Sequence, residues 1–365
     1  MGNLSDYIHW RGDLQFNKDK FNDVDNLVLS QLAYVDFTNI IPSDSSQRRI
    51  TLARASAEFF ETHSEDELRK VNTFIKDVPF FMKEAATTAR FKDIELSNYI
   101  DIVDDKAQMQ FAAFHVHLPD GTIYIAFRGT DDTIVGWRED FNMSFMSPVP
   151  SQIASVKYVK ETLKNNDCLV RLGGHSKGGN LAIYSAVKSE DDIKERIIDV
   201  YNNDGPGFDK NMIESNEYRQ MLPKIKTIVP YHSFVGMLLE HEEDYKVVKS
   251  NQKGIMQHDA MSWQIMGNAF QTHCKVSKSS SIIQEAMSKW INGMNMQDRA
   301  KFVDTLFSIL TASGAVNLSD VNSDLFKSAG AAIKMFNSLD AQTRGMLSNM
   351  LMSLRGEISR ARKKK

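Results

Sequence analysis

The sequence predicts an α/β fold with a mostly parallel sheet, N-terminal helices and a C-terminal helical extension. Between residues 107 and 275, β-rich apolar runs alternate with helical patterns, which is typical of a largely parallel sheet covered on both faces. At 168–188 a strand-like run passes through a glycine-rich turn into a helical pattern. Before residue 100 and after residue 276, helical periodicity dominates,.

Composition excludes several classes of protein. With 42% hydrophobic and 25% charged residues, the 365-residue chain has a globular composition rather than a disordered one,. Its 44 Lys and Arg against 47 Asp and Glu create no overall basic field, so we expect no nucleic-acid partner,. The start lacks a secretory-signal pattern, no apolar run approaches the ~18 residues that cross a bilayer, and two cysteines cannot build a disulfide framework,. We expect a cytoplasmic protein.

The N-terminal elements are helices. The run FNDVDNLVLSQLAYVDF at 21–37 spaces its apolar residues as a docked amphipathic helix does, and Pro42 ends it,. Two or three further helical patterns occupy 43–100, and the Ser64-x-x-Glu67 pair resembles a capping box,. We interpret this part as scaffold or cover.

The middle of the chain supplies the sheet. Two β-rich runs flank Pro119-Asp120-Gly121, a turn sequence that predicts a hairpin over 107–130,. Strands and helices then alternate: a helix at 151–164, a strand at 168–174, a helix at 179–188, and strands at 196–203 and 224–231.

The last 90 residues are helical and basic, with 13 Lys and Arg against 7 Asp and Glu. After a polar linker at 277–281, helical patterns cover 282–294, the surroundings of 302–310, and the surroundings of 329–358. We therefore divide the chain into a main domain, 1–275, and a helical extension, 276–365. The apolar faces and the basic end allow peripheral membrane contact, although a small bundle packed on the main domain with a solvated tail is the preferred interpretation.

The motif with the strongest chemical meaning is Gly174-His175-Ser176-Lys177-Gly178. A G-x-S-x-G sequence between a strand and a helix is the setting of a nucleophile elbow, which predicts Ser176 as a nucleophile. The alternative is a glycine-rich turn that cradles a phosphate or closes the sheet. In an elbow, the Lys177 N–H is one donor of an oxyanion hole, and the loop at 127–130 is placed to supply the other.

These segments resemble a known family. YIAFRGTDDTIVGWREDF and GGHSKGGNLA are similar to the F-R-G-[ST] segment and the elbow of fungal-type class 3 lipases. Together with FNDVDNLVLSQLAYVDF, NNDGPGF and VGMLLEHEEDY, they resemble the bacterial Mbeg1-like proteins, a lipase-related α/β-hydrolase family, over about residues 20–275,. The resemblance implies an α/β-hydrolase fold, with Ser176 as nucleophile and Thr130 as oxyanion residue. We interpret Arg128 and Asp140 as an ion pair or loop brace.

The general base should be a histidine downstream of Ser176, because chain order in this fold is Ser, acid, His. His258 follows the β-like YKVVKSN in a loop before an apparent helix, where the fold places its base. His241 lies within the charged LLEHEEDY, which indicates a solvated face. The downstream candidates are His232, His241, His258 and His273.

The acid is predicted at Asp204. Class 3 lipases carry it after the strand that matches 224–231, where this chain has Tyr231-His232-Ser233 instead. Asp204 in VYNNDGPGF ends the preceding strand and resembles the acid segment of vertebrate pancreatic-type lipases. The alternatives are an Asp204 that only opens a turn, or an acid at Asp209, Glu243 or Asp244.

Two further features bear on the site. Lys177 stands where lipases favour an apolar residue; we expect its side chain in solvent, the alternative being attraction of an anionic headgroup. His115 and His117 share one strand face, but no carboxylate stands at a ligand spacing, so we expect no metal,. The segment 206–222 and the N-terminal helices are candidates for a lid.

The resulting hypothesis is a serine hydrolase of the lipase/esterase type that cleaves an acyl ester or lipid through a Ser-His-Asp triad and an acyl-enzyme, without a cofactor. The alternative is a non-catalytic binding or regulatory protein on a hydrolase scaffold.

Overall fold

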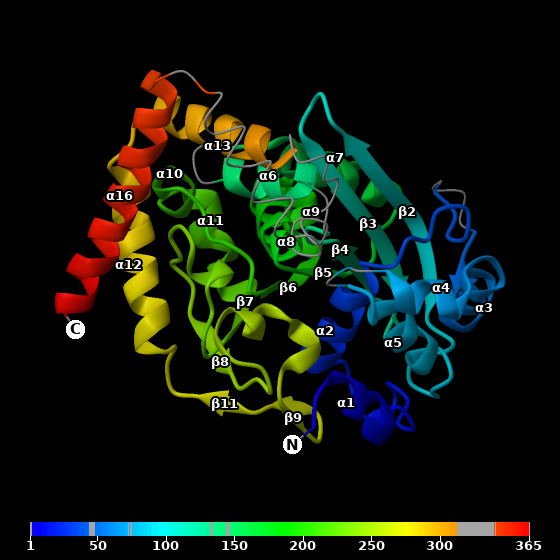
Figure 1. Cartoon of the computed structure of the whole chain (residues 1–365). Coiled ribbons are helices and arrows are strands. Elements are labelled where there is room, and N and C mark those ends of the chain that lie inside the picture. Colours follow the sequence, from blue (N-terminus) through cyan, green and yellow to red (C-terminus); the bar gives the residue numbers. More distant parts are fainter. Residues whose placement is uncertain are drawn as a thin grey trace.

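The computed structural model describes residues 2–43, 48–71, 73, 75–131, 134–143, 147–311, 339 and 341–364. Among these, nine strands form one sheet in the order β1-β2-β3-β4-β5-β6-β7-β8-β11, with helices on both faces (Figure 1). The pairs from β4 to β8 are parallel and the outer pairs antiparallel. This arrangement confirms the predicted α/β fold with a mostly parallel core.

The first four strands in the sheet order form its antiparallel part. It consists of β1 (Ile50–Thr51), β2 (Glu95–Asp104), β3 (Met109–His117) and β4 (Ile123–Phe127). The β3–β4 pair is the predicted hairpin, and its turn places Gly121 at φ 81°, a left-handed conformation that favours glycine,.

The parallel part comprises β5 (Val170–His175), β6 (Ile197–Asn203), β7 (Ile225–Pro230) and β8 (Tyr245–Val248). Among the connecting elements are α8 (Lys177–Lys188), α9 (Asp191–Arg196), α10 (Lys210–Ile213), α11 (Asn216–Met221) and the 3₁₀ turns η1 (Leu222–Lys224) and η2 (Val235–Met237). Because parallel strands end at the same edge, the segments after β4, β5, β6, β7 and β8 converge there.

Two hydrophobic cores cover the two faces of the sheet. On β4, Tyr124 and Ala126 belong to one core, while Ile123, Ile125 and Phe127 belong to the other, as strand alternation requires,. The first core includes residues of α1 (Leu4–Arg11), α2 (Asp23–Leu32), α3 (Leu52–Thr62) and α5 (Val78–Ala85); the second includes residues of α7 (Pro150–Leu163), α8 and α11. The short helix α4 (Glu65–Lys70) starts after Ser64 without the predicted side-chain cap.

The segment after β8 is less helical than predicted. It forms the 3₁₀ turns η3 (Gly254–His258) and η4 (Ala260–Ser262), then the short strands β9 (Ile265–Met266), β10 (Ala269–Phe270) and β11 (Thr272–His273). The apparent helix after His258 is therefore one three-residue turn, which Asp259 begins by accepting a hydrogen bond from the Met261 N–H.

The C-terminal part contains α12 (Lys278–Asn292), α13 (Met296–Thr311) and α16 (Ala341–Lys364), coloured yellow to red in Figure 1. The predicted linker at 277–281 is mostly the first turn of α12, because the Ser277 hydroxyl accepts the Ser280 N–H and starts the helix. Helix α13 contains the predicted 302–310 pattern, whereas much of the early half of the predicted 329–358 pattern lies outside the described residues.

Large apolar side chains of this part pack together. Their buried cluster contains Trp290, Phe302, Val303, Phe307, Leu347 and Met350. Helix α13 also contacts α6 (Ile134–Asn142), through an Arg138–Asp304 ion pair of 2.5 Å and a Phe141–Phe307 ring contact. Among the described helices, none is both long and apolar enough to cross a membrane.

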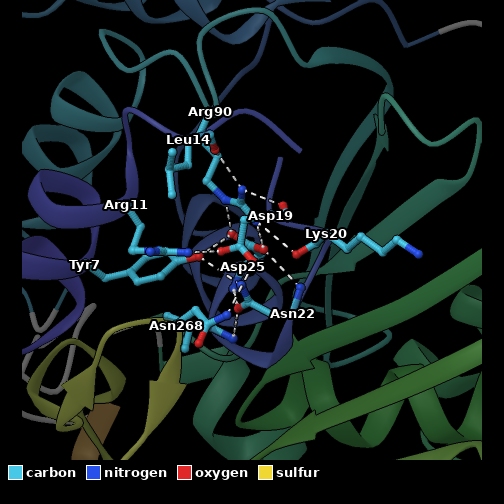
Figure 2. Close-up of polar contacts among 10 residues, drawn as sticks. Tyr7, Arg11, Leu14, Asp19, Lys20, Asn22, Asp25, Arg90 and Asn268 are labelled. Atoms are coloured by element: carbon cyan, nitrogen blue, oxygen red, sulfur yellow. Dashed lines mark hydrogen bonds and ion pairs between the residues drawn. The ribbon is translucent and has the colours of Figure 1, made fainter. Parts of the chain in front are cut away.

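A buried arginine joins the N-terminal segment to the stretch of chain between α5 and β2 (Figure 2). The Arg90 side chain is wholly buried, and its Nε and Nη2 donate to the Asp25 carboxylate at 2.7 and 2.5 Å. The Tyr7 hydroxyl donates to the same carboxylate at 2.8 Å. Arg90 also donates to the backbone carbonyls of Leu14, Asp19 and Lys20.

Replacing this arginine tests the arrangement. Arg90→Met leaves the Asp25 carboxylate buried without its cation, so we expect the free energy of unfolding to fall by about 3–5 kcal/mol. Urea unfolding of the full chain measures the change. The matched control is Arg54→Met, which removes an exposed i,i+4 partner of Glu58 and should change stability by less than about 0.5 kcal/mol. Equal effects of the two substitutions would contradict the prediction.

Candidate active site

The G-x-S-x-G sequence forms a sharp turn between β5 and α8. Ser176 has φ 56° and ψ −131°, a strained conformation for a residue with a side chain,. A Cβ added to Gly174 would lie 2.3 Å from the Gly178 carbonyl carbon, and one added to Gly178 would lie 2.2 Å from the Phe127 carbonyl oxygen. Both glycines are therefore required for the turn to pack against β4.

Three side chains from three loops form one hydrogen-bonded chain. His258 Nε2 lies 3.0 Å from Ser176 Oγ, and His258 Nδ1 lies 2.7 Å from Asp204 Oδ2. The Asp204 side chain is fully buried, whereas the His258 side chain is 23% exposed. With Nδ1–H donating to the carboxylate, Nε2 is the atom free to accept the serine proton.

The loop after β7 holds the carboxylate in place. Asp204 Oδ1 accepts hydrogen bonds from Ser233 Oγ at 2.5 Å and from the Gly236 N–H at 3.2 Å. Asp204 itself has φ 53°, so the chain turns sharply directly after β6. The loop after β7 thus supplies two hydrogen-bond donors to Asp204.

A second histidine, His175, contacts the backbone of His258. His175 Nε2 lies 2.8 Å from the His258 backbone carbonyl, and His175 Nδ1 lies 2.9 Å from the Tyr34 hydroxyl. Burial, reinforced by the nearby His258, lowers the pKa of His175 to about 3, so the ring is neutral,. Sequence reasoning missed this contact; its only signal was that His175 adjoins Ser176.

The residues predicted for the oxyanion hole, Thr130 and Lys177, each contact α6 through a side chain. Thr130 Oγ1 donates to Asp140 Oδ2 at 2.6 Å, so Asp140 braces the loop that follows β4. Burial raises the pKa of Asp140 to about 6, although Lys177 and the Thr130 hydrogen bond oppose the rise,. Lys177 is the first residue of α8, directly after the elbow.

The expectation that the Lys177 side chain reaches solvent is wrong. The side chain is 1% exposed, and Nζ lies 3.0 Å from Glu139 Oε2 and 2.9 Å from the Gln110 carbonyl oxygen. The cation is buried because α6 brings a carboxylate to it, a long-range partner that local sequence does not reveal.

The expectation of a solvated face at His241 is also wrong. Its side chain is 6% exposed, and Nδ1 lies 3.0 Å from Glu243 Oε1. Glu243 further accepts hydrogen bonds from Tyr218 and Thr227, so this alternative acid is engaged on the side of the sheet that faces α11.

The remaining candidates have other surroundings. Asp209 caps α10, Asp244 is exposed, and exposed His273 packs against Tyr231. His232 Nδ1 lies 3.2 Å from Ser279 Oγ. Within the described part of the chain, no group of three or more His, Cys, Asp or Glu side chains is arranged to hold a metal ion.

Arg128 forms a brace beside the site. Its Nη1 and Nη2 each donate to the Asp101 carboxylate at 2.6 Å, and the guanidinium is largely buried. This bidentate pair joins the loop after β4 to β2, so Arg128 is a loop brace whose ion-pair partner is Asp101,.

Comparison with known proteins adds the family. The model of the Mbeg1-like family matches residues 85–308, more than half of the chain. A search of curated proteins finds no match. Among solved structures, the chain is similar to one described as the native Rhizomucor miehei lipase propeptide complex, with 16% identity, coverage of 46% of this chain and 64% of that chain, and a TM-score of 0.33. The chain thus spans less than two thirds of that structure, and so weak a likeness supports no conclusion about function.

The buried Glu243 makes a testable contribution to acid stability. Burial opposes its ionisation, but the hydrogen bond and charge of His241 and the hydroxyls of Tyr218 and Thr227 outweigh burial and lower its pKa from 4.5 to about 2. A depressed pKa stabilises the fold above the unfolded value and loses that effect as pH falls from about 4.5 to 2.

We therefore expect Glu243→Gln to be less stable than the native chain by on the order of 2–3 kcal/mol at neutral pH, with the difference shrinking as pH falls toward 2. Urea unfolding at several pH values measures it. The exposed neighbour supplies the control, Glu242→Gln, which should follow the native pH dependence. If the difference in free energy of unfolding between Glu243→Gln and the native chain did not change with pH, ionisation of Glu243 would not contribute to stability.

Proposed function

Because the chain belongs to the Mbeg1-like family, which is lipase-related, we propose that it is a serine hydrolase of the lipase/esterase type that cleaves an acyl ester or lipid. The observation that carries the proposal is the hydrogen-bonded chain Ser176–His258–Asp204, in which a strained, glycine-flanked serine faces a histidine that a buried carboxylate orients. This set of groups performs nucleophilic acyl transfer without a cofactor.

In the acylation step, Ser176 Oγ attacks the acyl carbon while His258 Nε2 takes the hydroxyl proton. Asp204 holds Nδ1–H and stabilises the imidazolium that forms, because its own charge is buried and compensated by Ser233 and the Gly236 N–H. The imidazolium then protonates the departing alkoxide as the acyl–oxygen bond breaks. Water, deprotonated by His258, hydrolyses the acyl-enzyme and restores Ser176.

The negative charge on the acyl oxygen needs donors during both steps. We assign this role to the backbone N–H groups of Thr130, in the loop after β4, and of Lys177, the first residue of α8. The Thr130 hydroxyl donates to Asp140, which fixes the position of this residue and leaves its backbone N–H as the proposed donor,.

Covalent labelling tests the nucleophile. Because His258 activates Ser176, we expect one fluorophosphonate per chain in intact mass measurement, with peptide mapping to Ser176. Ser176→Ala should remain folded, take up no label and lose p-nitrophenyl ester turnover. A folded native chain that takes up no label would exclude the proposed serine hydrolase activity. A chain that binds the ester without being labelled would favour a non-catalytic role.

Paired substitutions test the acid. Asp204→Asn removes the charge that fixes the His258 tautomer, so we expect turnover of a p-nitrophenyl ester to fall by about 10⁴. Glu243→Gln is the matched control, since Glu243 faces His241 and not His258; its turnover should stay within about twofold of the native chain. A fall of only a few fold in Asp204→Asn would assign the acid to another residue.

A further inference from the structure

We propose that Glu139 and Lys177 form a positioning pair, which locks helix α6 to the nucleophile elbow and so holds the oxyanion site in register with Ser176. This inference rests on the proposed function and concerns the same site. It assigns a role to a feature of the elbow that departs from the lipase pattern, the lysine beside the nucleophile.

The contacts of Glu139 join four parts of the fold. Its Oε2 accepts from Lys177 Nζ at 3.0 Å and from the Gln110 N–H at 3.1 Å, and its Oε1 accepts from the Ser151 N–H at 2.9 Å. The side chain is fully buried. Helix α6 is thereby attached to the start of α8, to β3 and to the first turn of α7.

Asp140, the residue after Glu139 on α6, binds Thr130, the other proposed oxyanion residue. Asp140 Oδ2 accepts from Thr130 Oγ1 at 2.6 Å. Two consecutive residues of one helix therefore connect Lys177, on the elbow, with Thr130, on the loop after β4. Any movement of α6 relative to the elbow would change the separation of the two proposed oxyanion donors.

Burying the charges of Glu139 and Lys177 requires their desolvation, which opposes folding. Well-packed apolar residues of similar volume are often as stable as a buried ion pair or more so, so stability alone does not explain the pair. An ion pair with fixed hydrogen-bond partners instead defines one position of α6, because any other leaves a buried charge without its partner. The pair suits a site where displacement of a reacting group by about 1 Å can cost about 10²-fold in rate.

The test replaces the pair with apolar residues of similar size, Glu139→Leu together with Lys177→Met. The native chain must first be labelled at Ser176 and turn over a p-nitrophenyl ester, and labelling then counts the active sites in each preparation. We expect the double variant to melt below the native chain, because the buried N–H groups of Ser151 and Gln110 lose their acceptor,. Its kcat per labelled site should fall by about 10- to 100-fold, with KM within about twofold.

A more conservative double variant, Glu139→Gln with Lys177→Gln, keeps one carbonyl oxygen as acceptor for either the Ser151 or the Gln110 N–H group and removes the ionic contact,. We expect an intermediate loss in kcat of about 3- to 10-fold, again without a matching change in KM. If the Leu/Met double variant does not fold, the kcat of this Gln/Gln double variant tests the positioning role.

The control breaks another ion pair, on the strand that leads into the elbow. Arg171 lies on β5 and pairs with Asp120 and Asp199; it stands five residues before Ser176, about 16 Å along the strand. Arg171→Met should lower the melting temperature and leave kcat unchanged.

A folded double variant of either kind with native kcat would overturn the positioning role and leave the hydrolase proposal intact. An equal loss of kcat in Arg171→Met would also overturn it, since the effect would then follow general destabilisation. A native chain that neither labels nor hydrolyses esters would overturn both proposals.

Discussion

The close approach of the elbow to strand β4 is the constraint on which the site depends. Because Gly178 lies against the Phe127 carbonyl, the start of α8 is pressed onto the end of β4. Ser176 must then adopt a positive φ to pass from strand to helix. The loop after β4 also lies against the elbow, since a Cβ added to Gly129 would lie 2.5 Å from the His175 carbonyl oxygen. The proposed nucleophile and the proposed oxyanion loop are therefore positioned by packing at one place.

Buried charges around the elbow are compensated in separate small groups. Asp204 is held by Ser233, the Gly236 N–H and His258; Lys177 is held by Glu139; and Arg128 is held by Asp101. Each group joins segments that are distant in the chain, and each loses its compensation if one segment moves. Together they link the loops at the carboxyl edge of the sheet to one another and to the elements packed around them.

Much of the fold was predictable from local pattern. The β3–β4 hairpin follows from its turn tripeptide, and the parallel strands follow from apolar runs that alternate with helical patterns. The local sequence around His258 misled in one respect, because the predicted helix after it is a short 3₁₀ turn begun by Asp259. Ser176 was predictable from its motif, and His258 was predictable from the chain order of the fold, because each of these signals depends on position along the chain.

The sequence by itself determined the class of fold, the strained position of Ser176 and the order in which the candidate residues occur. These are local properties, set by glycine spacing, turn residues and apolar periodicity. The tertiary structure alone decided that Asp204 and not Glu243 faces His258, that Lys177 is buried against Glu139, and that His175 contacts the backbone of His258. A polar side chain finds its partner through the packing of distant segments, and this pairing leaves no trace in the residues that surround it along the chain.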